Sequence, residues 1–208
     1  PSSLINHPPI EDATLDAGSW FDSAFAAERV PTLDRALTLA EELDLAYEIE
    51  IKEVRDLDTY LMRLAELLST PERLARVHVI SFDHVALSVA KDRIPGLRTG
   101  GIVHERFADP VHVARSARLD RLCIDLDRFD LADAERIKAA GISIRCHAFS
   151  PVVLEDVAAA GLPWLDTLAE AIRSDLVDVV SSDDVAWARA FVADALAARR
   201  PASTAWLA

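Results

Sequence analysis

The stretch Tyr47-Glu48-Ile49-Glu50-Ile51-Lys52-Glu53 alternates apolar and charged side chains with the period of two that is typical of a β-strand. Helical apolar spacing flanks it on both sides, over residues 32–43 and 57–68. A strand between two helices usually belongs to a parallel sheet that is covered on both faces. Charges on such a strand are costly unless they pair, bind a metal or face a polar cavity. The alternative interpretation is a half-exposed antiparallel strand with an ordinary polar face.

The same succession of strand and helix recurs along the chain. Further strand-like runs are predicted over residues 77–82, 101–105, 122–127, 142–149 and 177–183. Helical patterns follow them, over residues 83–92, 109–118, 131–140, 152–160, 165–173 and 184–199. Six β-α units in unbroken alternation favour an α/β fold with a parallel sheet, either doubly wound or closed into a TIM-type barrel. Because the glycine-rich loops of nucleotide-binding folds are lacking in the sequence, the barrel is the better prediction.

Length and composition bound the class of protein. The 208 residues suffice for one sizeable core, so a single domain over residues 1–208 is expected. The net charge of -13 and the pI near 4.8 argue against nucleic acid or an anionic membrane surface as the partner. Cys123 and Cys146 are too few for a disulfide framework, so we expect reduced core thiols. No integral membrane segment or signal peptide is recognisable, which predicts a cytoplasmic protein.

Polar residues concentrate where the predicted strands end, and a parallel barrel places its chemistry at the carboxyl ends of its strands. Several of these residues precede predicted helices and are interpreted as N-caps, namely Asp83, Asp109, Ser150 and Asp183 or Asp184. His104 and His147 are lone histidines, for which a hydrogen-bonded structural role is the favoured interpretation and a catalytic role is the alternative. Glu50 and Lys52 combine a hard oxygen ligand with a cation on the same strand face. That pair suits a divalent metal that holds a phosphate group.

Three segments resemble the middle of the glycerophosphodiester phosphodiesterase family, in the same order and at similar spacing. They are Leu15-Asp16-Ala17-Gly18-Ser19-Trp20-Phe21, Glu28-Arg29-Val30-Pro31-Thr32-Leu33 and Ile49-Glu50-Ile51-Lys52. Residues 80–84 and 177–183 are similar to later family segments, so the resemblance covers about residues 12 to 198. It implies a TIM-type barrel that uses a divalent cation, magnesium or calcium, to hydrolyse glycerophosphodiesters to an alcohol and glycerol 3-phosphate. Glu50 then matches the family's metal-ligand glutamate, and Lys52 matches its lysine near the phosphate.

The chain departs from the family pattern in its catalytic motifs. The family's His-Arg-Gly, Glu-x-Asp and His-Asp motifs do not stand intact in this sequence. His7, in the run Leu4-Ile5-Asn6-His7-Pro8, is interpreted either as a vestige of the His-Asp strand or as part of a surface loop. The strand that usually ends in Trp-Thr-Val-Asn reads Cys146-His147-Ala148-Phe149-Ser150, which puts the family's aromatic pocket wall in doubt. His7, His104 and His147 are the catalytic candidates that remain in the sequence.

Six strands cannot close the usual eight-stranded barrel, and open sheet edges invite association. We expect residues 1–30 to be a remnant insertion or entry loop, residues 31–198 to hold the β-α units and residues 199–208 to form a tail. Either the intact protein extends upstream of Pro1, or a diverged form covers the gap with its N-terminal segment or a partner, such as a second copy in a homo-oligomer. The favoured function is a small-molecule phosphodiesterase of lipid metabolism with an incomplete active site. The alternative is a non-catalytic barrel remnant that acts as a binding or interaction module.

Overall fold

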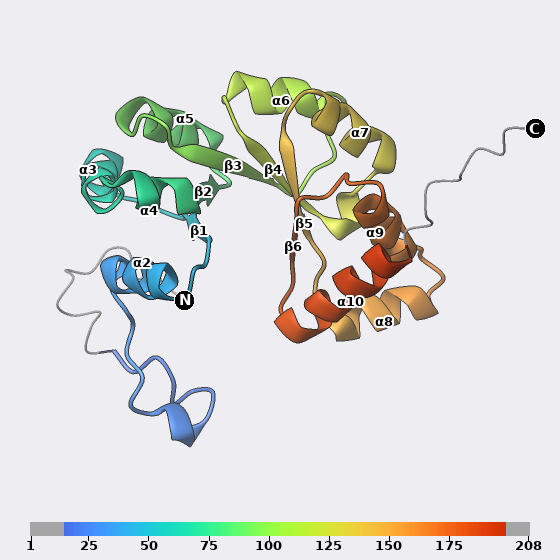
Figure 1. Cartoon of the computed structure of the whole chain (residues 1–208), viewed down its shortest axis with the longest axis horizontal. Helices are drawn as coiled ribbons and strands as arrows, with labels where there is room; N and C mark the ends of the chain where they lie inside the picture. Colours follow the sequence, from blue (N-terminus) through green and yellow to red (C-terminus); the bar gives the residue numbers. More distant parts are fainter. Residues whose placement is uncertain (1–14, 199–208) are drawn as a thin grey trace, which may run out of the picture. The chain divides into compact units, whose positions relative to one another are not determined.

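A computed structural model describes residues 15–198, in which strands and helices alternate along the chain (Figure 1). These residues divide into two compact units, one that ends at Thr99 and one that begins at Gly100. His7 lies outside the described residues, as do the predicted tail and half of the predicted entry loop. In the part of the chain that the structure describes, no helix is long and apolar enough to cross a membrane.

The first unit contains two parallel strands and the helices that cover them. Tyr47 of one strand pairs with Val77 of the other, and the parallel register continues to Glu50 and Ile80. The antiparallel interpretation of the Tyr47–Glu53 stretch is therefore wrong, and the parallel prediction is confirmed. The elements are η2 (Ser23–Phe25), α2 (Leu33–Glu42), β1 (Tyr47–Glu50), α3 (Leu57–Leu67), α4 (Pro71–Arg76), β2 (Val77–Ser81) and α5 (His84–Arg93).

Alternation along β1 decides which of its side chains are buried. Ile49 and Ile51 are buried, whereas Glu50 remains partly accessible on the opposite face. Val77 and Val79 of β2 are fully buried, and α5 packs against both β2 and α3. The apolar half of the opening stretch thus faces the helices, and its charged half faces away from them.

The second unit contains four strands that pair in parallel and in chain order. Strand β3 (Arg98–Val103) crosses the boundary between the units, and its residues from Gly100 pair with β4. Strand β4 pairs with β5, and β5 pairs with β6. The remaining elements are α6 (Pro110–Ser116), β4 (Arg121–Asp125), η3 (Leu126–Arg128), α7 (Leu131–Ala139), β5 (Ser143–His147), α8 (Pro151–Ala159), α9 (Trp164–Arg173), β6 (Val179–Ser181) and α10 (Val185–Ala197). The predicted α/β fold with six β-α units is confirmed.

The two cysteines lie in the core as free thiols, as predicted. Cys146 is packed with Leu154 and Leu168, which α8 and α9 contribute to the same cluster. Burial, helped by the nearby charge of Asp125, raises the pKa of the Cys146 thiol to about 12. The thiol is therefore protonated at neutral pH and behaves as a small apolar side chain.

The predicted helix caps are largely confirmed. Asp83 accepts hydrogen bonds from two backbone amides, and the carboxylates of Asp109 and Asp184 each accept one, from His112 and Trp187. Ser150 occupies the N-cap position of α8, but its side chain makes no capping hydrogen bond. Helix α4 was not predicted, because six residues are too few to show a helical apolar period.

Strand boundaries differ from the prediction at β3. The strand begins at Arg98 rather than at residue 101, so Gly100 and Gly101 lie within the strand and pair with Arg121 and Leu122. Glycines lower strand propensity, which is why the sequence pattern placed the start too late.

Candidate functional site

The motif Leu15–Phe21 forms a loop built around the Asp16 carboxylate. This carboxylate accepts hydrogen bonds from the backbone N–H groups of Gly18 and Ser19, at 3.0 and 2.9 Å, and one from the Ser19 hydroxyl. These bonds, led by that of the Ser19 hydroxyl, lower the pKa of Asp16 to about 2. A Cβ at Gly18 would stand 2.1 Å from the backbone oxygen of Phe25, so the close approach of the two segments requires glycine. Asp16 and Gly18 of the motif therefore have a structural role, because they hold this loop in its conformation.

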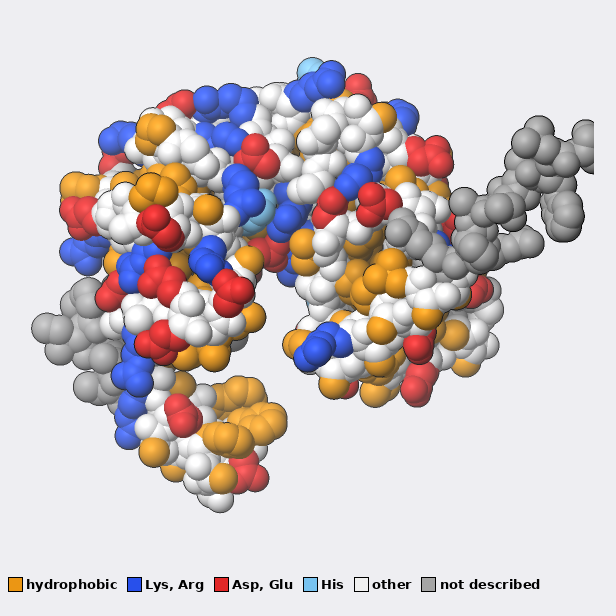
Figure 2. Space-filling model, viewed as in Figure 1, with side chains coloured by type: hydrophobic (Ala, Val, Ile, Leu, Met, Phe, Trp, Pro, Cys, Tyr) orange, Lys and Arg blue, Asp and Glu red, His pale blue; other side chains and the backbone are white. Residues whose placement is uncertain are grey.

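The same loop exposes an aromatic cluster. Trp20 and Phe21 are 81% and 70% exposed, and Phe25 packs beside Phe21 with ring centroids 5.8 Å apart. The cluster is part of the hydrophobic surface over the η2 segment in Figure 2. The indole N–H of Trp20 donates to the backbone oxygen of Ala17, which fixes the ring on the loop.

Glu50 and Lys52 lie on one face at the carboxyl end of β1. The Glu50 carboxylate and the Lys52 ammonium are 3.9 Å apart, and the two side chains are 32% and 64% exposed. Between them, the Ile51 N–H donates to the Ile80 carbonyl at 2.8 Å, and the buried Ser81 hydroxyl donates to the Ile51 carbonyl at 2.6 Å. The backbone of the pair is thus fixed by β2, while both charged heads reach solvent. An ion pair of this exposure contributes roughly 0–1 kcal/mol, so fold stability alone gives little reason for it.

A divalent cation needs more ligands than Glu50 provides. Calcium and magnesium take about six oxygen ligands, partly from water and substrate. Among residues 15–198, no three His, Cys, Asp or Glu side chains gather in a way that could hold a metal ion. The described residues therefore do not form a complete metal shell, and Glu50 stays a proposed ligand.

His104 is held by Asp125 in the second unit. The residue follows the last residue of β3, and its Nδ1 lies 2.8 Å from a carboxylate oxygen of Asp125, the last residue of β4. The imidazole is 61% exposed, whereas the Asp125 side chain is 19% exposed. Arg128 donates from Nε to the His104 backbone carbonyl at 3.3 Å. An imidazole oriented by a carboxylate and open to solvent can transfer protons.

His147 continues this polar row on the next two strands. The strand register pairs Asp125 with His147 and His147 with Ser181, so the three side chains lie on the same face of the sheet. His147 Nδ1 is 3.2 Å from the Ser181 hydroxyl oxygen. Both histidines are therefore hydrogen-bonded, which is compatible with a structural role and with proton transfer alike. Their partners Asp125 and Ser181 were visible in the sequence only as strand-end polar residues.

The chain after β5 holds a strained residue. Phe149 adopts φ 56°, the left-handed region, which costs a bulky side chain about 1–2 kcal/mol. The Ser182 hydroxyl donates to the Phe149 carbonyl at 2.8 Å, and the Ala148 N–H donates to the Ser181 carbonyl at 2.7 Å. The Phe149 ring contacts the rings of His147 and Trp164, with centroids 5.1 and 5.8 Å away. An aromatic cluster thus stands at this strand end although the sequence departs from the Trp-Thr-Val-Asn pattern.

Comparisons with known proteins point to one group of enzymes. The chain is 32% identical over 104 residues to a glycerophosphodiester phosphodiesterase of Caldanaerobacter subterraneus, a match of 48% of this chain and 42% of that relative. An Oleispira antarctica phosphodiesterase, solved with its product sn-glycerol 3-phosphate, superposes with a TM-score of 0.72 at 22% identity over 89% of this chain and 70% of that one. A glycerophosphodiester phosphodiesterase from Agrobacterium tumefaciens gives 0.66 at 20% identity over 88% and 70%. No protein-family profile matches the chain.

These likenesses confirm the predicted resemblance to glycerophosphodiester phosphodiesterases and the predicted TIM-type α/β fold. The match spans less than half the length of the curated relative. A match of this length does not establish the activity of the whole protein.

Proposed function

We propose that this chain is a metal-dependent phosphoric diester hydrolase that cleaves glycerophosphodiesters to an alcohol and glycerol 3-phosphate. The observation that carries the proposal is the Glu50–Lys52 pair at the carboxyl end of β1, within a chain that resembles enzymes of this activity. The product bound to the Oleispira antarctica protein supports the substrate class. Lipid metabolism, a cytoplasmic location and the assignment of residues 1–208 to one domain stay predictions.

In this proposal Glu50 is a ligand of the divalent cation, magnesium or calcium, and Lys52 binds the phosphate. A bound cation would screen the charge of the phosphodiester. Lys52 is suited to the phosphate because its ammonium group is largely exposed and its backbone position is fixed by the neighbouring strand. Glu50 provides the hard carboxylate oxygen that both metals prefer.

Hydrolysis also needs a proton acceptor for the attacking hydroxyl and a proton donor for the leaving oxygen. His104 and His147 are the described candidates, and His104 is the stronger because its imidazole is oriented by Asp125 and is well exposed. His7 stays a candidate from the sequence.

Calorimetric titration with magnesium and calcium tests the role of Glu50. We expect Glu50→Gln to weaken metal binding at least about tenfold without unfolding the chain, because the amide is nearly isosteric but uncharged. Glu66→Gln, on the exposed surface of α3, is the matched control. Equal affinity in the wild type and Glu50→Gln would remove Glu50 from the metal site.

Release of glycerol 3-phosphate from glycerophosphocholine tests the activity. We expect slow, metal-dependent turnover at most, because one proton-transfer group typically contributes ~10²–10⁴-fold and the family's catalytic motifs are not intact in this chain. Turnover that is lost in Lys52→Met would support the proposed phosphate site.

The alternative is a non-catalytic binding module. It is favoured by the lack of a three-residue metal cluster in the described part of the chain. Saturable binding of glycerol 3-phosphate with no turnover in either metal would support this second function over the first.

A further inference from the structure

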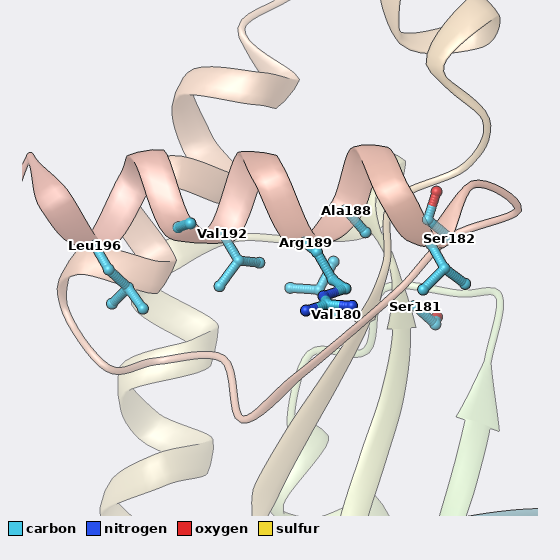
Figure 3. Close-up of a pocket in the computed structure, with 9 residues that line it drawn as sticks. Val180, Ser181, Ser182, Ala188, Arg189, Val192 and Leu196 are labelled. Atoms are coloured by element: carbon cyan, nitrogen blue, oxygen red, sulfur yellow. The ribbon is translucent and has the colours of Figure 1, made fainter.

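An apolar groove runs along α10 in the second unit (Figure 3). Its volume is about 560 Å³, and α10 lines it with Val185, Arg189, Val192 and Leu196. Val180 of β6 also lines it. Val185 and Leu196 are 69% and 43% exposed, so the groove is open to solvent.

The residue spacing explains why the groove is continuous. Positions 185, 189, 192 and 196 follow the spacing of three and four residues that places side chains on one helix face. Apolar faces of this kind normally pack against another element. Strand β6 beside the groove pairs only with β5 among the described strands, so its other edge has no strand partner there.

Arg189 gives the groove a charge preference. It is the cation among the lining residues, and it has no ion-pair or hydrogen-bond partner within residues 15–198. A ligand for this groove would therefore combine an apolar ridge with a carboxylate. Arginine is enriched at protein interfaces and among the residues that contribute most to binding.

Helix α2 of the first unit and the residues just after it carry such an apolar surface, formed by Leu39, Leu43 and Leu45, which we call the α2 ridge. Leu39 and Leu43 are 53% and 58% exposed and stand four residues apart, hence on the same side of the helix. Leu45, 51% exposed, extends the apolar surface toward β1. Strand β1 in turn pairs only with β2 among the described strands.

A carboxylate lies beside this ridge. Glu42 is exposed and has no partner within the described residues, whereas Glu41 and Asp44 are paired with Arg73 and Arg76. Glu42 is three residues from Leu39, so it borders the same stripe. The α2 surface thus offers both features that the groove requires.

We propose that the groove along α10 binds the α2 ridge of a second copy of this chain, with Glu42 of that copy paired to Arg189. The contact joins two different surfaces, so it is head-to-tail and can continue into a ring or a short filament. A single helix in a groove buries less than the roughly 1,200–2,000 Å² of stable interfaces, so the association is weak and depends on protein concentration. The inference does not depend on the proposed catalytic function.

The contact has a defined register. Arg35, one turn before Leu39, is an exposed cation on the α2 stripe and would repel Arg189. The register must therefore bring Glu42, and not Arg35, to the guanidinium. Charge reversal at Glu42 should then weaken association, and reversal at both partners should restore it.

Sedimentation equilibrium of the full chain up to about 100 μM tests the charge pair. We expect mass to increase with concentration in the wild type, and Arg189→Glu or Glu42→Arg to weaken association about tenfold or more. The double variant carrying both substitutions should regain association. Arg115→Glu on α6 and Glu66→Lys on α3 are matched controls at exposed positions. A wild-type chain that stays monomeric would overturn the proposal.

Mixing two blocked variants tests the head-to-tail geometry. Val192→Asp blocks the groove and Leu39→Asp blocks the ridge, so each variant alone should be monomeric. An equimolar mixture should form a dimer and nothing larger, because each variant keeps the surface that the other lacks. Val152→Asp and Met62→Asp, at positions 68% and 58% exposed, should associate like the wild type. A mixture that remains monomeric, or capture of a different molecule by the groove, would overturn the second-copy assignment, and circular dichroism verifies that every variant is folded.

Discussion

The Asp16 loop and the His104–Asp125–His147 row are held in opposite ways. In the loop, the Asp16 carboxylate binds groups two and three residues along the chain. In the row, His104 binds a residue 21 positions away, and the His147–Ser181 bond spans 34 positions. The loop is consequently visible as a sequence motif, whereas the row exists only once four strands have aligned.

The loop and the row therefore depend on the hydrophobic core to different extents. Local hydrogen bonds need only a short segment to adopt one conformation. Cross-strand bonds need the strand register, which the apolar face of the sheet fixes by burial. Damage to the core should therefore disturb the row and spare the loop.

The largest effect is expected from Leu168→Ala. Leu168 is fully buried in the cluster that contains Cys146 and Leu154, so the substitution leaves a cavity under β5. We expect a loss of about 2–5 kcal/mol in the free energy of unfolding. Hydrogen exchange should accelerate in β5 while the amides of Gly18 and Ser19 keep their protection. Equal acceleration in both regions would contradict the distinction.

Gly18→Ala perturbs the Asp16 loop and leaves the core of the second unit unchanged. The added Cβ collides with the Phe25 backbone, which cannot move aside as a side chain end can. We expect a cost of about 1–3 kcal/mol, or local unfolding of the loop, measured by urea denaturation and by Trp20 fluorescence. Gly141→Ala, where nothing lies within 4 Å but φ is +78°, controls for backbone strain alone. Unchanged Trp20 fluorescence would show that the loop adapts.

Asp125→Asn should have a smaller effect on stability and a specific effect on His104. The hydrogen bond lies partly in solvent, so about 1 kcal/mol or less of stability is at stake. The orientation of the His104 imidazole should be lost, which two-dimensional NMR of the ring protons would detect. Glu135→Gln, at an exposed position of α7, is the comparison variant and should leave these signals unchanged.

The smallest effect concerns acid stability. Hydrogen bonds hold the pKa of Asp16 at about 2, below its ordinary value of 3.8. A lowered folded pKa gives stability that is present above pH 3.8 and is lost as the pH falls toward 2. Asp16→Asn should therefore lose less stability than the wild type between pH 4 and pH 2, measured as Tm against pH. Parallel Tm curves would show that Asp16 does not contribute.

Much of the fold was predictable because it rests on local periodicity. The alternation along Tyr47–Glu53 and the helical spacing on either side correctly predicted β1 and its neighbours. Aspartates before helix-forming runs correctly predicted the caps at Asp83 and Asp109, since capping joins residues two or three apart. Short α4 and the glycine-containing start of β3 carried no such signal.

By itself the sequence determined the succession of β-α units, the parallel sheet, the core thiols and the two side chains Glu50 and Lys52 on one strand face. The strands, helices and buried faces follow from periodicity within about ten residues, and the parallel sheet follows from the repeated alternation of strand and helix. Only the tertiary structure decided that His104 meets Asp125, that His147 meets Ser181 and that α10 keeps an open groove beside Arg189. Those contacts join residues far apart in the chain, and their partners are fixed by strand register and helix packing, which no local pattern encodes.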